Sequence, residues 1–289
     1  MKPAWLLPCL LLCALGACAP SEPAAAPPQE DSLAIIDAHI HTDFTNKPEP
    51  TSGIEVSREE LVREMRAAGV VGAVAHTGSG GEGYVDLRAE HVATCAGVDA
   101  KVDVARVEAG LVDRRYRCIK IYLGYVHQFA ADPGYRPAYE LAERYRVPVV
   151  FHTGDTYSSK AKLKYSDPLT VDEVAVDWPN VTFVIAHVGN PWIESAAEVA
   201  YKNPNVYLDG SALLIGDLAK APPDKVTRYV VEPLSWVFGY LEDPSKLMFG
   251  SDWPLTDIPT YAAAFRRAIP REHHKAVFHD NAARIFTLP

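Results

Sequence analysis

Residues 34–41 read AIIDAHIH and set the reading of the whole chain. The apolar start predicts a strand over residues 34–40 that is buried on both faces, as parallel strands are. A doubly wound open sheet would carry a glycine-rich phosphate-binding turn directly after its first strand. Two histidines, His39 and His41, follow this strand instead. The stretch therefore disfavours the doubly wound sheet, which remains the alternative fold.

Similar apolar runs recur along the rest of the chain. Short segments rich in Val and Ile predict strands at 34–40, 71–76, 91–97, 117–123, 147–153, 181–187, 206–210 and 247–251. Ser57 and Glu60 form a capping box before LVREMRAAG. Further helices are predicted at 100–112, 137–146, 192–202, 224–241 and 258–269, whereas 77–90 and 154–180 read as loops. Eight strands alternating with helices favour a single-domain (β/α)8 TIM barrel over residues 34–289.

The first 33 residues are predicted to contain a targeting signal followed by a linker. Residues 1–17 carry Lys2 followed by an apolar stretch too short to span a membrane, which predicts a secretory signal peptide. The stretch LGAC at 15–18 resembles the bacterial lipobox, in which the cysteine is lipidated. Cys18 is therefore the expected lipidation site, and a signal peptide with a chance cysteine is the alternative. Residues 18–33, rich in Pro, Ala and acids, predict a disordered tether.

These features predict a location for the protein. Lipid chains on Cys18 would hold it to a bilayer without a spanning helix. Ala19, rather than Asp, follows this cysteine. By resemblance to Gram-negative lipoproteins, the protein is expected in the bacterial cell envelope, on the outer membrane and facing the periplasm.

Charge and cysteine usage narrow the class further. Lys plus Arg number 28 against 37 for Asp plus Glu, a formal net charge of -9. This balance argues against a nucleic-acid partner, which needs clustered positive charge. Cys95 and Cys118 fall on the neighbouring predicted strands 91–97 and 117–123. They form either a disulfide or two buried free thiols.

Histidines and an aspartate stand where the predicted strands end. His39 and His41 are two residues apart and share a face of their strand. His152 and His187 close two later strands, and Asp252 follows the last one. The carboxyl ends of barrel strands meet at one mouth, where barrel active sites are built. Imidazoles and a carboxylate there predict a site for a divalent metal such as Zn²⁺.

The motifs that carry these residues resemble a known family. DAHIHT, FHTGD, IAHVGN, FGSDWP and HDNAARIF are similar to motifs of the amidohydrolase superfamily, in its amidohydrolase-2 branch, over about residues 34–289. The resemblance implies a TIM barrel with one divalent metal, and the ligand types favour Zn²⁺. It implies metal ligands at His39, His41, His152 and Asp252, and a catalytic histidine at His187.

The expected reaction is hydrolysis of a small-molecule amide, ester or lactone by a metal-activated water. Asp252 would accept the proton of the water and pass it to the leaving group, and His187 would polarise the carbonyl or orient the water. The same branch contains non-oxidative decarboxylases and metal-independent lactonases. A decarboxylase is therefore one alternative, and a non-catalytic surface binding protein is another. The oligomeric state stays open.

Other residues near the strand ends are assigned less directly. Lys120, within the strand 117–123, is expected to contact a substrate carboxylate or to form an ion pair. In binuclear members a lysine of this strand is carbamylated and bridges two metals, which is the alternative for Lys120. Tyr122 and Trp253 are expected to line the substrate pocket. Asp37 either accepts a hydrogen bond from a ligand imidazole or serves as a solvated or capping carboxylate.

Overall fold

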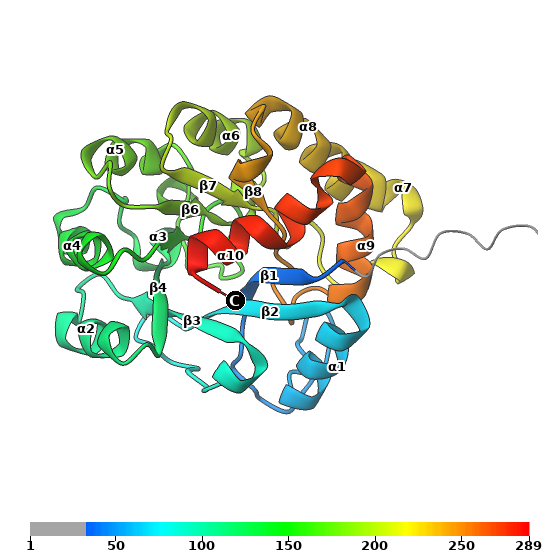
Figure 1. The fold of residues 1–289 in the computed structure, drawn as a ribbon, viewed down its shortest axis with the longest axis horizontal. Helices are drawn as coiled ribbons and strands as arrows, with labels where there is room; N and C mark the ends of the chain where they lie inside the picture. The colour runs from blue at the N-terminus through cyan, green and yellow to red at the C-terminus, as the bar shows by residue number, and fades with distance from the viewer. Residues whose placement is uncertain (1–32, 289) are drawn as a thin grey trace, which may run out of the picture. The chain divides into compact units, whose positions relative to one another are not determined.

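Eight parallel strands form the centre of the structure, a computed structural model that describes residues 33–288 (Figure 1). The predicted signal peptide and Cys18 lie outside the described residues. The strands pair in chain order from β1 to β8. They are β1 Ile35–Ile40, β2 Val70–His76, β3 Val92–Val98, β4 Tyr116–Ile121, β5 Val149–Phe151, β6 Phe183–Ile185, β7 Val206–Asp209 and β8 Leu247–Met248. All eight predicted strands are present, which confirms the (β/α)8 barrel.

Hydrogen bonds between β1 and the chain around the end of β8 bring the two edges of the sheet together. The backbone N–H of Ala38 donates to the carbonyl of Phe249 at 2.9 Å. The N–H of Asp252 donates to the carbonyl of His39 at 2.7 Å. This closure places the residues after β8 directly beside the end of β1.

Helices surround the strands in Figure 1. Helix α1 begins at Arg58 because Ser57 Oγ accepts a hydrogen bond from the Glu60 N–H at 3.2 Å, and it ends at Gly69 in the left-handed conformation. No helix within residues 33–288 combines the length and apolarity needed to cross a membrane. The helices are α1 Arg58–Ala68, α2 Val104–Val112, α3 Leu123–Val126, α4 Arg136–Tyr145, α5 Thr170–Asp177, α6 Ile193–Lys202, α7 Pro223–Val226, α8 Glu232–Leu241, α9 Ile258–Ala268 and α10 Asn281–Phe286.

Two predicted segments differ from the structure. The single helix expected over 224–241 is divided into α7, a π-helical turn at 227–231, and α8. The loop expected over 154–180 contains α5, which buries Val171, Val174 and Ala175. Leu169 at the start of α5 supplies no side-chain cap, and the helix has only 8 residues. Its short apolar pattern therefore gave little signal in the sequence.

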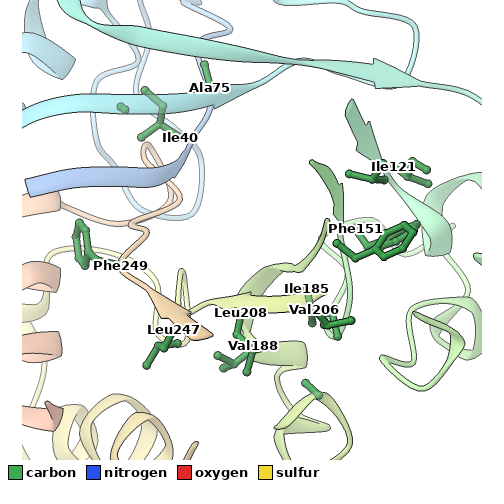
Figure 2. Close-up of a cluster of buried hydrophobic side chains, with 14 of the residues drawn as sticks. Ile40, Ala75, Ile121, Phe151, Ile185, Val188, Val206, Leu208, Leu247 and Phe249 are labelled. Atoms are coloured by element: carbon green, nitrogen blue, oxygen red, sulfur yellow. The ribbon is translucent and has the colours of Figure 1, made fainter. Parts of the chain in front are cut away.

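Apolar side chains pack in two layers around the strands. The outer layer lies between strands and helices, and Figure 2 shows part of it around Ile40, Phe151 and Phe249. A separate inner cluster joins side chains from most of the strands with Ile285 and Phe286 of α10. Because strands from all sides contribute, this cluster fills the barrel interior. Helix α10 crosses the ring of strands in Figure 1 and covers one of its ends.

Cys95 and Cys118 belong to this inner cluster and are bonded to each other. They are register partners on β3 and β4, and their Cα atoms are 4.3 Å apart. Both residues are completely buried. The structure thus has the disulfide rather than two free thiols.

A buried carboxyl group beneath α9 makes stability depend on pH. Glu64 of α1 is 1% exposed, and its Oε2 accepts a hydrogen bond from the Ile258 N–H at 2.8 Å. Burial raises the pKa of Glu64 to about 7. Because this pKa is higher folded than unfolded, the stabilisation is complete below about pH 4.5 and is lost as the pH rises through 7.

We expect Glu64→Gln to stabilise the protein at alkaline pH, since glutamine keeps the acceptor without the charge. The difference in unfolding free energy between Glu64→Gln and the wild type should rise by about 2 to 3 kcal/mol in favour of the variant between pH 4.5 and pH 8.5. Urea denaturation at both pH values measures this gain. Glu59→Gln, an exposed change on the same helix, is the control. A Glu64→Gln advantage that stays constant with pH would contradict the assignment.

Candidate active site

Three of the predicted metal ligands converge at the carboxyl ends of β1 and β8. Nε2 of His39 lies 3.5 Å from Oδ1 of Asp252, and Nε2 of His41 lies 3.2 Å from the same oxygen. Asp252 has a φ of 65°, in the left-handed region that few residues other than glycine adopt. Such strain costs about 1 to 3 kcal/mol and is concentrated at functional sites. The three residues form a group whose ligand atoms are all within 4.8 Å of one another.

The outer nitrogens of both rings are fixed by acceptors. Nδ1 of His39 donates to Oδ2 of Asp209 at 3.0 Å, and Nδ1 of His41 donates to the carbonyl oxygen of His76 at 3.0 Å. In a neutral ring, the proton on Nδ1 leaves Nε2 as a lone pair. Both Nε2 atoms therefore face Oδ1 of Asp252, a buried oxygen without a hydrogen-bond donor. Three converging acceptors are what a metal ion requires, so these residues fit one.

Burial keeps His39 neutral. The ring is completely buried, and this burial together with the nearby Lys120 ammonium holds its pKa well below the usual range. Nζ of Lys120 lies 3.4 Å from Nε2 of His39, and burial lowers the pKa of this lysine to about 8. The neutral imidazole is the form that binds metals.

Asp209 connects His39 to the predicted catalytic histidine. Its Oδ1 accepts a 2.5 Å hydrogen bond from Ser211 Oγ, which lies 2.9 Å from Nδ1 of His187. The hydroxyl proton of Ser211 points to Asp209, so Nδ1 of His187 is the donor in the second bond. Asp209 and Ser211 were not among the predicted site residues. Asp209 ends the predicted strand 206–210, so its place at a strand end was the signal that could have found it.

His152 joins the cluster through His187. Its Nε2 donates to the carbonyl oxygen of Asp155 at 2.8 Å, and its Nδ1 lies 3.1 Å from Nε2 of His187. Neutral rings would place two acceptor nitrogens face to face, an arrangement that a shared proton or a metal ion relieves. The structure places His152 next to the group of His39, His41 and Asp252 but not within it.

A cavity of about 790 Å³ opens above these residues. Tyr122 lines it, as expected, and its hydroxyl donates to the carbonyl oxygen of Thr77 at 2.8 Å. Lys120 and Trp253 do not line it, because both are completely buried. Lys120 lies behind His39, and the Trp253 ring packs edge-on against Phe44 at 6.2 Å. The pocket-lining position predicted for Trp253 is therefore not observed, and Lys120, predicted to contact a substrate carboxylate or to form an ion pair, lies against His39 away from the cavity surface.

Asp37 has a different role from either alternative drawn from the sequence. Its Oδ1 accepts hydrogen bonds from the backbone N–H groups of His39 at 3.1 Å and Ser251 at 2.9 Å. The residue is completely buried, and this burial raises its pKa to about 7. Asp37 thus fastens the end of β1 to the segment after β8, below the candidate metal-binding group of His39, His41 and Asp252.

A (β/α)8 barrel with histidines and an aspartate gathered at its strand ends is an arrangement typical of metal-dependent enzymes. Residues 36–288 match the family model described as amidohydrolase. The chain therefore belongs to the amidohydrolase family, which confirms the resemblance found in its motifs. No curated protein matches the sequence significantly.

Solved structures with the same fold include both hydrolases and decarboxylases. One is an amidohydrolase from Burkholderia multivorans with bound zinc, at 19% identity and a TM-score of 0.65 over 89% of this chain and 100% of that one. Another is a probable 2-pyrone-4,6-dicarboxylic acid hydrolase from Acinetobacter baumannii with bound citric acid. It has 16% identity and a TM-score of 0.64 over 88% of this chain and 99% of that one. A third is 5-carboxyvanillate decarboxylase from Sphingomonas paucimobilis. It has 14% identity and a TM-score of 0.62 over 89% of this chain and 100% of that one. At these identities the likeness shows the fold alone.

Proposed function

We propose that the protein is a metal-dependent hydrolase of a small-molecule ester, lactone or amide. The observation that carries this proposal is the convergence of two imidazole lone pairs on an unpartnered buried carboxylate oxygen. His41 and Asp252 line the floor of a cavity large enough for a small organic substrate, and His39 is buried beside them. Hydrolysis needs nothing more at such a site than a metal, a water and a base.

One ion per chain fits the donor set best. His39, His41 and Asp252 would hold it, with His152 as a further ligand. Imidazole and carboxylate donors suit Zn²⁺, and the Burkholderia relative was solved with zinc. When bound, such an ion supplies Lewis acidity and lowers the pKa of water to about 7. A second ion held by a carbamylated Lys120 is the alternative arrangement, and Nζ of this lysine lies 3.4 Å from Nε2 of His39.

The residues around the cavity floor supply the proton transfers. Asp252 accepts the proton of the attacking water, whose oxygen bonds to the carbonyl carbon of the substrate. The C–O or C–N bond then breaks, and the leaving group takes that proton from Asp252. Nδ1 of His187 lies 4.0 Å from Oδ2 of Asp252, so the ring stands beside this carboxylate, and its Nε2 is the nitrogen left to orient the water or the substrate carbonyl. Ser211 and Asp209 fix the orientation of the His187 ring.

A screen of purified protein tests the reaction. Lactones, esters, amides and aromatic carboxylates are offered with Zn²⁺, while acid release and carbon dioxide are recorded in parallel. Hydrolysis without carbon dioxide is the expected result. Carbon dioxide from an aromatic carboxylate would make the protein a decarboxylase, the other activity among its structural relatives. Binding without turnover of any class would favour a surface binding protein.

We also propose that the protein is lipid-anchored in the bacterial envelope, on the outer membrane and facing the periplasm. The lipobox-like LGAC at 15–18 and the predicted tether support this location. The buried disulfide between Cys95 and Cys118 suits an oxidising compartment.

Cys18→Ser is expected to move the protein from the membrane fraction to the soluble fraction, since it removes the lipidation site. Fractionation of cells that express the full chain, followed by immunoblotting, measures this shift. Cys13→Ser, within the predicted signal peptide, is the matched control and should leave the protein in the membrane. Unchanged membrane association of Cys18→Ser would refute the anchor.

A further inference from the structure

We propose that the cavity takes uncharged esters or lactones with a ring, and that it disfavours substrates with a carboxylate away from the bond that is cleaved. This inference rests on the proposed hydrolase function and adds the substrate class to it. It depends on the walls of the cavity, which stand beside His39, His41 and Asp252.

One wall is aromatic, and its hydroxyl groups are already engaged. Tyr122, Tyr125 and Tyr157 line this side of the cavity. The Tyr125 hydroxyl accepts a hydrogen bond from the Tyr157 N–H at 2.8 Å, and the Tyr157 hydroxyl donates to Glu49 at 3.0 Å. Tyr122 donates to a backbone carbonyl at 2.8 Å. Tyr122 and Tyr157 thus donate to the protein, and Tyr125 keeps its own O–H proton, so the wall offers ring surface with one hydroxyl donor, which suits another ring.

The segments after β7 and β8 contribute aliphatic side chains. Leu213, Leu214, Ile215 and Leu255 line the cavity there. The Gly216 N–H donates to the Leu255 carbonyl at 2.8 Å, which holds the two segments together. The cavity of about 790 Å³ therefore combines an aromatic and an aliphatic surface. Apolar surface of this kind stabilises an apolar substituent at about 25 cal/mol per Å² buried.

The charges on the walls do not favour an anion. Asp43 and Asp155 line the cavity outside the metal-binding group. Among residues 33–288, Lys225 is the only Lys or Arg that lines it, and this residue is exposed. An exposed ion pair contributes only about 0 to 1 kcal/mol. A metal at the floor can neutralise one oxyanion, but a second carboxylate against these walls would lose hydration without gaining a buried partner.

Two esters that differ in one group test the inference. Phenyl hexanoate and monophenyl adipate have the same acyl length, but a terminal carboxylate replaces the methyl group in the second. We expect kcat/KM to be at least about tenfold higher for phenyl hexanoate, because a pocket without a partner for a buried charge discriminates at least this strongly. An equal or higher value for monophenyl adipate would overturn the inference.

A designed cation sharpens the test. Ile215→Arg should reduce the preference about two- to fivefold by giving the adipate carboxylate a partner, the scale of an exposed ion pair, whereas Ile215→Gln, which is polar but uncharged, should keep it. An unchanged preference in Ile215→Arg would count against the wall charges as its cause. Near-native circular dichroism of both variants controls for folding.

Binding separates this inference from the hydrolase proposal. Hexananilide and N-phenyladipamic acid are the corresponding amides, and calorimetry measures their affinity for the zinc-loaded protein. Tighter binding of hexananilide, even if no ester is hydrolysed, supports the substrate class while the reaction fails. Equal or tighter binding of the acid, or no binding of hexananilide, overturns the substrate class whatever the reaction.

Discussion

Asp252→Asn is expected to lower kcat by on the order of 10³-fold or more while the fold is kept. Asparagine has nearly the same shape as aspartate, so packing at this buried position is preserved. Its amide can donate a hydrogen bond to Nε2 of His41, which lies 3.2 Å from Oδ1 in the wild type. The variant loses the carboxylate that accepts the proton and serves as a negatively charged metal ligand. It gains an amide N–H that can pair with the lone pair on Nε2 of His41.

Thermal unfolding without metal therefore serves as the control for this variant, and its midpoint should equal or exceed that of the wild type. Asp177→Asn is the matched activity control, because Asp177 is exposed at the end of α5 and does not line the cavity. It should keep kcat within a few-fold of the wild type. A fully active Asp252→Asn protein would remove Asp252 as the base.

The second large effect concerns metal content. Wild-type protein is expected to hold about one divalent ion per chain, as a single-metal site requires. His39→Ala should weaken ion binding by more than about 100-fold, because it removes a ligand nitrogen rather than one of its supports. His187→Ala should retain the ion and still lose turnover. Elemental analysis after dialysis, with kinetics on the same samples, measures both quantities.

Together, His39→Ala and His187→Ala distinguish a residue that binds the ion from a residue that acts in the reaction without binding it. His279→Ala, which removes a ring that pairs with Asp280 outside the site, is the control for general loss of histidine. Retention of the ion by His39→Ala would contradict the assigned group. A metal-free wild-type protein that is still active would sink the whole mechanism.

The sequence was most informative where structure repeats. Buried parallel strands are continuous apolar runs, so all eight could be predicted, and the rule that barrel sites gather at strand ends brought out His39, His41 and Asp252. Helix α5 was missed because a helix of 8 residues carries too short a pattern.

The remaining features of the site could not be predicted, because they depend on how deeply a side chain is buried and on which residues it contacts in the fold. Lys120 belongs to the strand end in sequence, but it lies behind a histidine and away from the cavity. Asp209 and Ser211 matter because of the atoms they meet, which are 22 to 170 residues away along the chain. Cys95 and Cys118 could be predicted as neighbours, but their bonding could not.

Helix α10 has a consequence for the traffic of small molecules. Because its Ile285 and Phe286 belong to the cluster that fills the barrel interior, that end of the barrel offers no passage. The substrate therefore reaches the site from one end of the barrel only, so substrate and product enter and leave through the same cavity opening. A product that lingers there blocks the next arrival, and turnover at high product concentration should show competitive inhibition.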